Sequence, residues 1–135
     1  LSASPNYQAV PGMVALVVDD EPDLLEIATT HLTEIGYRVI QATDGPSALS
    51  AHAQADRIDL LLTDVIMPGG MNGVKLAEQI RALRPGIRTV YTSGFPSQTL
   101  AERNGTRVDG PLLNKPYVKG EFVKMISHVM EETRA

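Results

Sequence analysis

The sequence predicts an α/β fold, a doubly wound sheet of five parallel strands with helices on both faces. Two observations indicate it. Strand-sized apolar runs alternate with helical stretches five times along the chain. The first and third runs, at residues 13–19 and 58–63, are nearly all apolar, which is typical of interior parallel strands covered on both faces. The chain has 135 residues and no cysteine, which suits one domain that folds without disulfides.

The expected elements follow one another from residue 13 onward. Strands are expected at residues 13–19, 37–42, 58–63, 87–92 and 110–114, and helices at residues 22–35, 46–55, 73–83, 97–103 and 119–132. The fourth helix has the weakest pattern. The first twelve residues contain Ser, Pro, Asn, Gln and Gly without periodicity. Residues 1–12 are therefore expected to form a linker or flexible N-terminal segment before a single domain at residues 13–135.

Local chemistry supports the first and last helices. Pro22 suits a first helical turn, and Gly36 can adopt the left-handed conformation that ends a helix. Both helices carry an apolar stripe at helical spacing, formed by Leu24, Ala28, Leu32 and Ile35 in the first and by Phe122, Ile126 and Val129 in the last. Both stripes are interpreted as core.

The composition excludes several classes of function. The net charge is −4, and no segment gathers enough Lys and Arg for a basic stripe, so direct nucleic-acid binding is not expected. The longest apolar runs fall far short of the roughly 20 residues that a membrane span requires. The chain does not open with a signal-peptide pattern. We therefore expect a soluble cytoplasmic protein without membrane insertion.

Acidic residues lie at the ends of the first and third strands. Asp19 and Asp20 follow the first strand, and Asp64 follows the third. If these strands are neighbours, their ends lie about 5 Å apart and the carboxylates converge. Repulsion in such a cluster would either raise the pKa values of the carboxylates or recruit a cation, and a hard ion such as Mg²⁺ suits oxygen ligands without His or Cys. The alternative is that Asp19 and Asp20 merely cap the first helix.

A hydroxyl and a cation are expected at the same edge of the sheet. Ser93 ends the fourth strand and Lys115 follows the fifth; each alone is an ordinary loop residue. Together with the carboxylates they form a complete phosphoryl site. Asp64 supplies the acceptor oxygen, Mg²⁺ and Lys115 offset charge, and Ser93 donates a hydrogen bond. Thr92 is a rival for the hydroxyl role.

Four separated motifs resemble the receiver domain of two-component response regulators over residues 13–132. They are Asp19-Asp20, Asp64 followed by Met67-Pro68, Ser93-Gly94, and Lys115-Pro116. The resemblance implies a flavodoxin-like sheet with strand order 2-1-3-4-5. It also implies that Asp20 and Asp64 bind Mg²⁺ directly, that Asp19 acts largely through water, and that the carbonyl of Ile66 completes the protein ligands. Ser93 and Lys115 would contact the phosphoryl group, Ser93 being preferred to Thr92 because Gly94 follows it.

The resemblance also implies function and partners. The domain would catalyse its own phosphorylation on Asp64, from a phosphohistidine of a histidine kinase or histidine phosphotransferase domain, and its own dephosphorylation. It would signal by conformational change to a downstream protein partner or a missing output domain, and it could form a homodimer through the face of the fourth helix, fifth strand and fifth helix. Ser93-Gly94-Phe95, the linker-like start and the Gly69-Gly70 loop, one residue longer than usual, are similar to the C-terminal receivers of hybrid sensor histidine kinases.

One departure and two other functions complete the sequence-based predictions. The family often has Tyr or Phe three residues before the lysine, where the ring moves inward on activation, and this chain has Leu112. A pseudo-receiver that never turns over phosphate is one alternative. A Mg²⁺-dependent aspartyl-phosphate phosphohydrolase is another, but such enzymes place a second Asp two residues after the nucleophile, where this chain has Ile66.

Overall fold

The sheet has five parallel strands in the order β2-β1-β3-β4-β5, which confirms the predicted architecture and strand order. The structure is a computed structural model that describes residues 7–67 and 72–132. The Gly69-Gly70 loop, on which one prediction depends, lies outside the described residues. The strands are β1 (Val14–Val18), β2 (Arg38–Ala42), β3 (Leu60–Asp64), β4 (Arg88–Ser93) and β5 (Leu112–Asn114).

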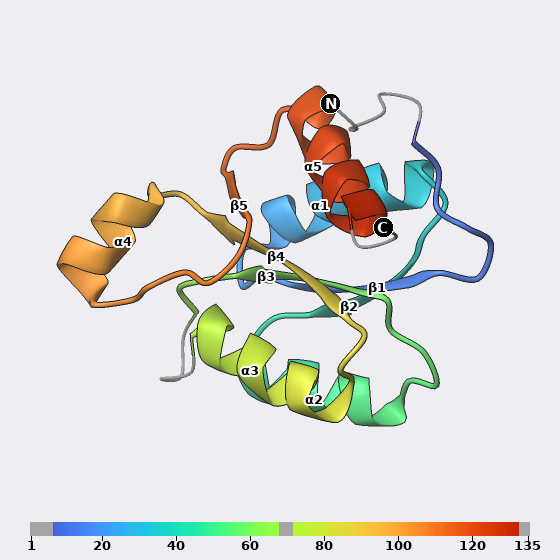
Figure 1. Cartoon of the computed structure of the whole chain (residues 1–135), viewed down its shortest axis with the longest axis horizontal. Helices are drawn as coiled ribbons and strands as arrows, with labels where there is room; N and C mark the ends of the chain where they lie inside the picture. The colour runs from blue at the N-terminus through green and yellow to red at the C-terminus, as the bar shows by residue number, and fades with distance from the viewer. Residues whose placement is uncertain (1–6, 68–71, 133–135) are drawn as a thin grey trace.

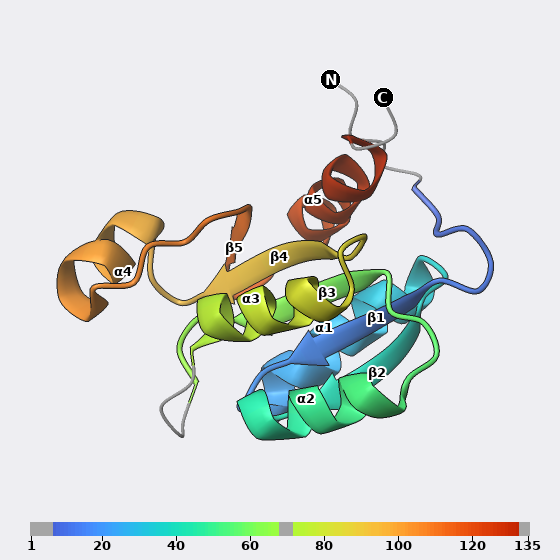
Figure 2. The same ribbon diagram turned by 60° about the horizontal axis from the view of Figure 1, so that its bottom comes forward.

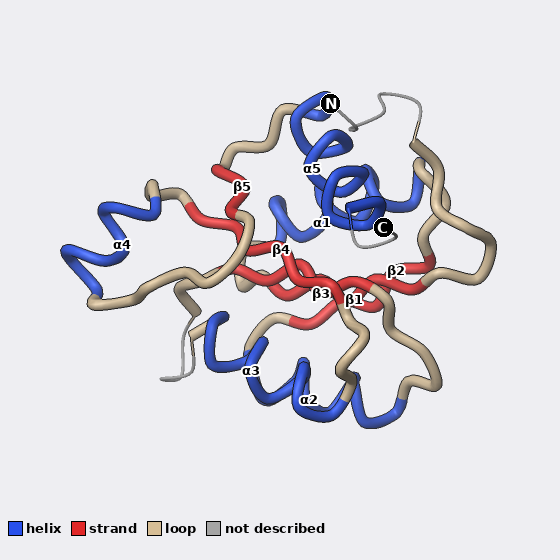
Figure 3. Tube along the Cα trace, viewed as in Figure 1, coloured by secondary structure: helices blue, strands red, loops and turns tan. Residues whose placement is uncertain are grey.

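Helices cover both faces of the sheet (Figures 1 and 3). One face is covered by α1 (Pro22–Glu34) and α5 (Lys119–Glu132), and the other by α2 (Gly45–Gln54) and α3 (Gly73–Leu83). The remaining helix, α4 (Ser97–Asn104), lies beyond the β5 edge in both ribbon views (Figure 2). No helix within the described residues is long and apolar enough to cross a membrane.

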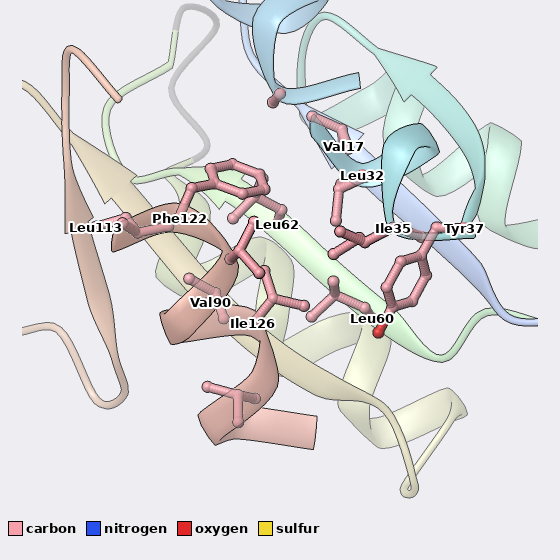
Figure 4. Close-up of a cluster of buried hydrophobic side chains, with 14 of the residues drawn as sticks. Val17, Leu32, Ile35, Tyr37, Leu60, Leu62, Val90, Leu113, Phe122 and Ile126 are labelled. Carbon is pink, nitrogen blue, oxygen red and sulfur yellow. The ribbon is translucent and has the colours of Figure 1, made fainter. Parts of the chain in front are cut away.

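Side chains of the central strands alternate between two hydrophobic cores, as the two-residue period of a strand requires. Val17, Leu62 and Val90 face α1 and α5, where they pack with Phe122 and other residues of the first core (Figure 4). The second core, between the sheet and α2 and α3, is formed by Leu16, Leu61, Tyr91, Leu76 and Ile80 among others. The central strands β1 and β3 are buried on both faces, as their apolar sequences predicted.

The predicted apolar stripe of the first helix is confirmed at Ala28, Leu32 and Ile35 and differs at one position. Leu25, Ala28 and Leu32 are buried, whereas the predicted Leu24 is half-buried. Because 3.6 residues make one turn, Leu24 and Leu25 lie on adjacent faces and spacing alone does not separate them. Gly36 has φ of +102°, so the left-handed helix end is confirmed.

The described part of the N-terminal segment packs against the domain. The hydroxyls of Tyr7 and Tyr37 lie 2.8 Å apart, and both rings are buried in the first core. The amide of Ala9 donates to the carbonyl of Ile35 at 2.7 Å. Residues 1–12 were expected to form a linker or flexible N-terminal segment; of these, the structure describes residues 7–12, where the Tyr7 ring is buried in the first core.

A buried histidine joins α2 to the turn after α3. His52 Nδ1 accepts a hydrogen bond from Arg84 Nε at 2.7 Å, and Arg84 Nη2 donates to the carbonyls of His52 and Ala55. Burial, together with the adjacent guanidinium, lowers the pKa of His52 below its usual value. The histidine is therefore neutral in the folded domain, as an acceptor for arginine must be.

This histidine predicts a loss of stability in mild acid. Below about pH 6.5 the unfolded chain takes up the proton before the folded domain does, so the free energy of unfolding falls until the lower folded pKa is reached. In His52→Asn, an amide oxygen replaces Nδ1 and cannot titrate. Urea unfolding at pH 7.5 and pH 5.5 is expected to show a smaller loss in this variant than in the parent. Equal losses would mean that His52 does not contribute.

Candidate functional site

Three carboxylates converge at the carboxyl edge of the sheet. Asp64 is the last residue of β3, and Asp19 and Asp20 directly follow β1, its neighbour in the sheet. One oxygen atom of each lies within 4.8 Å of the others, which is the spacing of a possible metal site. Asp19 and Asp64 are buried, and Asp20 is exposed. The structure thus brings together the three acidic residues that the sequence singled out.

Lys115, which follows β5, reaches across the sheet edge to these carboxylates. Its Nζ lies 3.0 Å from Asp19 Oδ2 and 3.0 Å from Asp64 Oδ2, and its side chain is only 7% exposed. Glu21 Oε1 lies 3.4 Å from the same Nζ. The role of Glu21 was missed in the sequence, although its position directly after Asp19-Asp20 was a usable signal. The lysine therefore makes ion pairs with three acidic residues.

Burial disfavours the charged form of Asp64. Desolvation, with a contribution from the adjacent Asp19, raises the pKa of Asp64 to about 6, against the opposing effects of Lys115 and of the Ile66 amide that hydrogen-bonds to it. The pKa of Lys115 is raised because Asp64 and Asp19 outweigh its own burial. The lysine is thus a fixed positive charge in this pocket.

The donor set suits a hard divalent cation. Asp19 Oδ2 is buried and makes no hydrogen bond among the described residues, although Lys115 Nζ lies within ion-pair distance of it. One lysine faces three clustered carboxylates, so negative charge remains in excess. Carboxylates without His or Cys match the ligand preference of Mg²⁺, which keeps part of its water shell. Asp19, Asp20 and Asp64 therefore fit a magnesium ion.

Ser93, rather than Thr92, lines the same pocket. A hollow of about 250 Å³ is lined by Asp64, Lys115, Ser93, Ile66 and Phe95, among others. Ser93 Oγ accepts a hydrogen bond from the amide of Phe95 at 2.9 Å, and its hydroxyl proton can still be donated. The hydroxyl of Thr92 is instead engaged with Tyr117.

Size alone does not identify this site. A larger hollow of about 410 Å³ lies among residues at the opposite ends of the strands, including Gly12, Arg38 and Arg57. That hollow does not contain the acidic cluster. The smaller hollow at the carboxyl edge is where parallel α/β sheets bind ligands, and the chemistry of its residues identifies it as the candidate site.

The fold and the site together define a doubly wound α/β protein with a carboxylate cluster at the carboxyl edge of its sheet and a lysine ion-paired to it. Residues 15–127 match the model of the response regulator receiver domain. The chain belongs to this family.

Two curated relatives differ in how much of their length the chain covers. The response regulator receiver protein CpdR of Brucella abortus (strain 2308) is 28% identical over 115 residues, which are 85% of this chain and 94% of CpdR. The transcriptional regulatory protein GlrR of Escherichia coli (strain K12) is 28% identical over 121 residues, which are 87% of this chain but only 26% of GlrR. The receiver therefore matches nearly all of one relative and a small part of the other.

Solved structures agree in fold. A response regulator receiver protein from Sinorhizobium medicae WSM419 superposes with a TM-score of 0.75 at 27% identity, covering 88% of this chain and 94% of that one. The receiver domain of the hybrid histidine kinase CckA gives a TM-score of 0.69 at 29% identity, covering 87% and 98%. Two-component signalling is the general function of the family to which this chain belongs.

Proposed function

We propose that this domain accepts a phosphoryl group on Asp64 from a phosphohistidine donor, in a reaction that depends on Mg²⁺, and signals by changing conformation. One observation carries the proposal: a buried Lys115 is ion-paired with both Asp64 and Asp19 beside the hollow that Ser93 lines. A phosphoacceptor needs a carboxylate nucleophile and fixed positive charge next to it, and this pocket contains both.

The roles of the side chains follow from their positions. A carboxylate oxygen of Asp64 attacks phosphorus, and the phosphorus–nitrogen bond to the donor imidazole breaks with its electron pair leaving on nitrogen. The Lys115 ammonium moves from the Asp64 carboxylate to one phosphoryl oxygen. The Ser93 hydroxyl donates a hydrogen bond to a second phosphoryl oxygen. Asp19, Asp20, Asp64 and the carbonyl of Ile66 would hold Mg²⁺, Asp19 acting largely through water. When bound, the cation would offset charge on the phosphoryl oxygens.

The partners follow from this chemistry. The donor is a histidine kinase or a histidine phosphotransferase domain, and the signal passes to a downstream protein or an output domain outside this sequence. The same proposal includes a homodimer formed through α4, β5 and α5. The likeness to the CckA receiver supports an origin in a hybrid histidine kinase.

Incubation with acetyl phosphate and Mg²⁺, followed by intact mass measurement, tests the proposal. A single phosphoryl adduct supports it. Absence of any adduct would favour the pseudo-receiver, a pure interaction module. Continuous release of phosphate from unrelated phosphomonoesters would favour the phosphohydrolase instead.

Asp20→Ala is expected to remove both the phosphorylation and its response to Mg²⁺, because it deletes a direct ligand at the exposed side of the pocket. The matched control is Asp23→Ala, an exposed acidic residue in the first turn of α1, which should label at the parental rate. The measurement is the initial rate of adduct formation against Mg²⁺ concentration. A parent that labels equally fast in EDTA would contradict the metal site.

The phosphoryl group is expected to be long-lived. Hydrolysis needs a water held in line behind phosphorus. The side chains at the hollow, Ile66 and Phe95, are 38% and 43% exposed and offer no hydrogen bond. Ile66→Asn and Phe95→Glu should accelerate decay roughly tenfold or more, which corresponds to about 1.4 kcal/mol of barrier.

The test of this lifetime is the decay of the purified adduct after removal of the donor. Leu83→Asn is a suitable control, because Leu83 is an exposed leucine on α3 that does not line the hollow. If the parent decays within seconds, or if neither polar substitution speeds decay, water access at these two positions does not set the lifetime.

A further inference from the structure

The aromatic ring beside the fifth strand comes from β4 in this protein. Leu112 begins β5, and its partner across the sheet is Tyr91 of β4. Tyr91 is completely buried, whereas Leu112 is half-buried. Leu112 has no hydroxyl and cannot form a switchable hydrogen bond. Tyr91 therefore supplies both the ring and the hydroxyl in this region of the second core.

The Tyr91 hydroxyl is part of a three-residue hydrogen-bonded cluster, the Tyr91–Asp109–Arg81 cluster. Tyr91 donates to Asp109 Oδ1 at 2.5 Å, and Arg81 Nη2 donates to Asp109 Oδ2 at 2.8 Å. Arg81 lies on α3, and Asp109 lies in the connection between α4 and β5. One carboxylate thus joins three segments that are separate in the sequence.

The cluster extends from the core to the surface. The side chains of Arg81 and Asp109 are 34% and 42% exposed, while the Tyr91 ring is completely buried. Burial, together with the hydrogen bond to Asp109, raises the pKa of Tyr91, so the phenol remains a protonated donor. Because the buried Tyr91 hydroxyl is bonded to the partly exposed Asp109, a movement of the ring would alter the protein surface at Asp109.

Tyr91 is also mechanically linked to the phosphorylation site. It lies two residues before Ser93, so both side chains lie on the same face of β4. The amide of Tyr91 donates to the carbonyl of Pro111, and the amide of Lys115 donates to the carbonyl of Ser93, at 2.8 and 2.9 Å. The end of β4 and β5 are thus tied together by their backbones.

The connection around Asp109 packs closely on the ring. A Cβ atom added at Gly110 would lie 3.4 Å from the Tyr91 ring. Displacement of the end of β4 by Ser93 would therefore either carry residues 106–111 with it or break the hydroxyl–carboxylate bond. The arrangements with and without the Tyr91–Asp109 hydrogen bond would be the two states that such a switch requires.

We propose that the Tyr91–Asp109–Arg81 cluster transmits phosphorylation of Asp64 from Ser93 to the surface formed by α3 and residues 106–111. The inference rests on the proposed phosphorylation of Asp64. In this proposal the conformational change reaches the surface beside α3, through the connection between α4 and β5. Leu112 stands where the family often has the aromatic residue that moves on activation.

The test uses NMR of protein labelled with ¹³C at the ζ carbon of its four tyrosines, because this carbon responds to the hydrogen bond of the hydroxyl. Signals are assigned with single Tyr→Phe variants and followed on addition of beryllofluoride and Mg²⁺. We expect the Tyr91 signal to shift on activation, together with the amide signals of residues 106–111, while the Tyr7 and Tyr37 signals stay in place.

Tyr91→Phe keeps the ring and removes the hydroxyl. It should be labelled by acetyl phosphate at the parental rate but lose the activation-dependent shifts of residues 106–111. Tyr37→Phe is the matched control, because it also deletes a buried, hydrogen-bonded hydroxyl, in the first core, and it should keep those shifts. Should Tyr91→Phe fail to fold, Asp109→Ala removes the acceptor from a partly exposed loop and should give the same loss.

The outcomes separate this inference from the proposed function. A parent in which Ser93 responds to beryllofluoride while the Tyr91 signal does not move overturns the inference alone. The same holds if Tyr91→Phe or Asp109→Ala retains the parental shifts of residues 106–111. A parent that neither labels nor responds at Ser93 overturns both the inference and the proposed function.

Discussion

Asp64→Asn is expected to abolish the phosphoryl adduct completely. An amide is a poor nucleophile and cannot carry an acyl phosphate. The measurement is intact mass after incubation with acetyl phosphate and Mg²⁺. Asp56→Asn, which alters an exposed carboxylate before the same strand, is the control and should label like the parent. Undiminished labelling of Asp64→Asn would exclude Asp64 as the acceptor.

Loss of labelling in this variant is not expected to reflect loss of fold. Burial already disfavours the charged form of Asp64, whose pKa is raised to about 6, and the amide carries no charge to desolvate. The thermal midpoint in EDTA should therefore be unchanged or higher than that of the parent. A large fall in the midpoint would mean that the ion pair with Lys115 holds the pocket together.

Gly73→Ala is expected both to destabilise the domain and to displace Asp64 from its position in the candidate site. A Cβ atom at Gly73 would overlap the carbonyl oxygen of Asp64, lie 3.0 Å from the Asp64 carbonyl carbon, and lie 3.1 Å from Val65 Cα. These are backbone atoms that cannot rotate away, and the Gly73 amide donates to the Val65 carbonyl at 2.8 Å. The first turn of α3 would have to move away from the end of β3.

Overpacking of this kind costs about 1–3 kcal/mol, and occasionally more. Urea unfolding should show this loss for Gly73→Ala, and the labelling rate of the folded fraction should also fall because Asp64 is displaced. Gly86→Ala is the matched control, since no atom lies within 4 Å of an added Cβ there, and both measurements should stay close to the parent. Parental stability in Gly73→Ala would show that α3 adjusts freely.

The sequence could predict the sheet and the acidic cluster because both follow from position along strands. Apolar runs between Val14 and Asp64 determine which strands are interior, and parallel strands bring their carboxyl ends to one edge. The strand order followed from the resemblance and is confirmed. Lys115 was predicted in the pocket for the same reason, and its ion pairs to Asp64 and Asp19 place it there.

Contacts that depend on side-chain direction could not be predicted. The Tyr91–Asp109–Arg81 cluster joins residues 10 to 28 positions apart, as the numbering shows, through a loop whose path no periodicity describes. The buried Tyr7 lies in a stretch whose composition resembles a linker. Composition does not show that a single aromatic ring in such a stretch packs into the core. Leu25 rather than Leu24 faces the core, although the two lie three and four residues before Ala28 and so both fit its helical spacing.

The position of α4 gives this domain an uneven local stability. The helix lies beyond the sheet edge, begins without a side-chain cap, and has eight residues, fewer than an isolated helix needs to persist in water. Its Leu100 is completely buried in the second core. Among the α4 side chains that the structure describes, Leu100 is the buried one. The α4 amides should therefore exchange with solvent through local fraying long before those of β1 and β3, which are expected to exchange only when the whole domain unfolds.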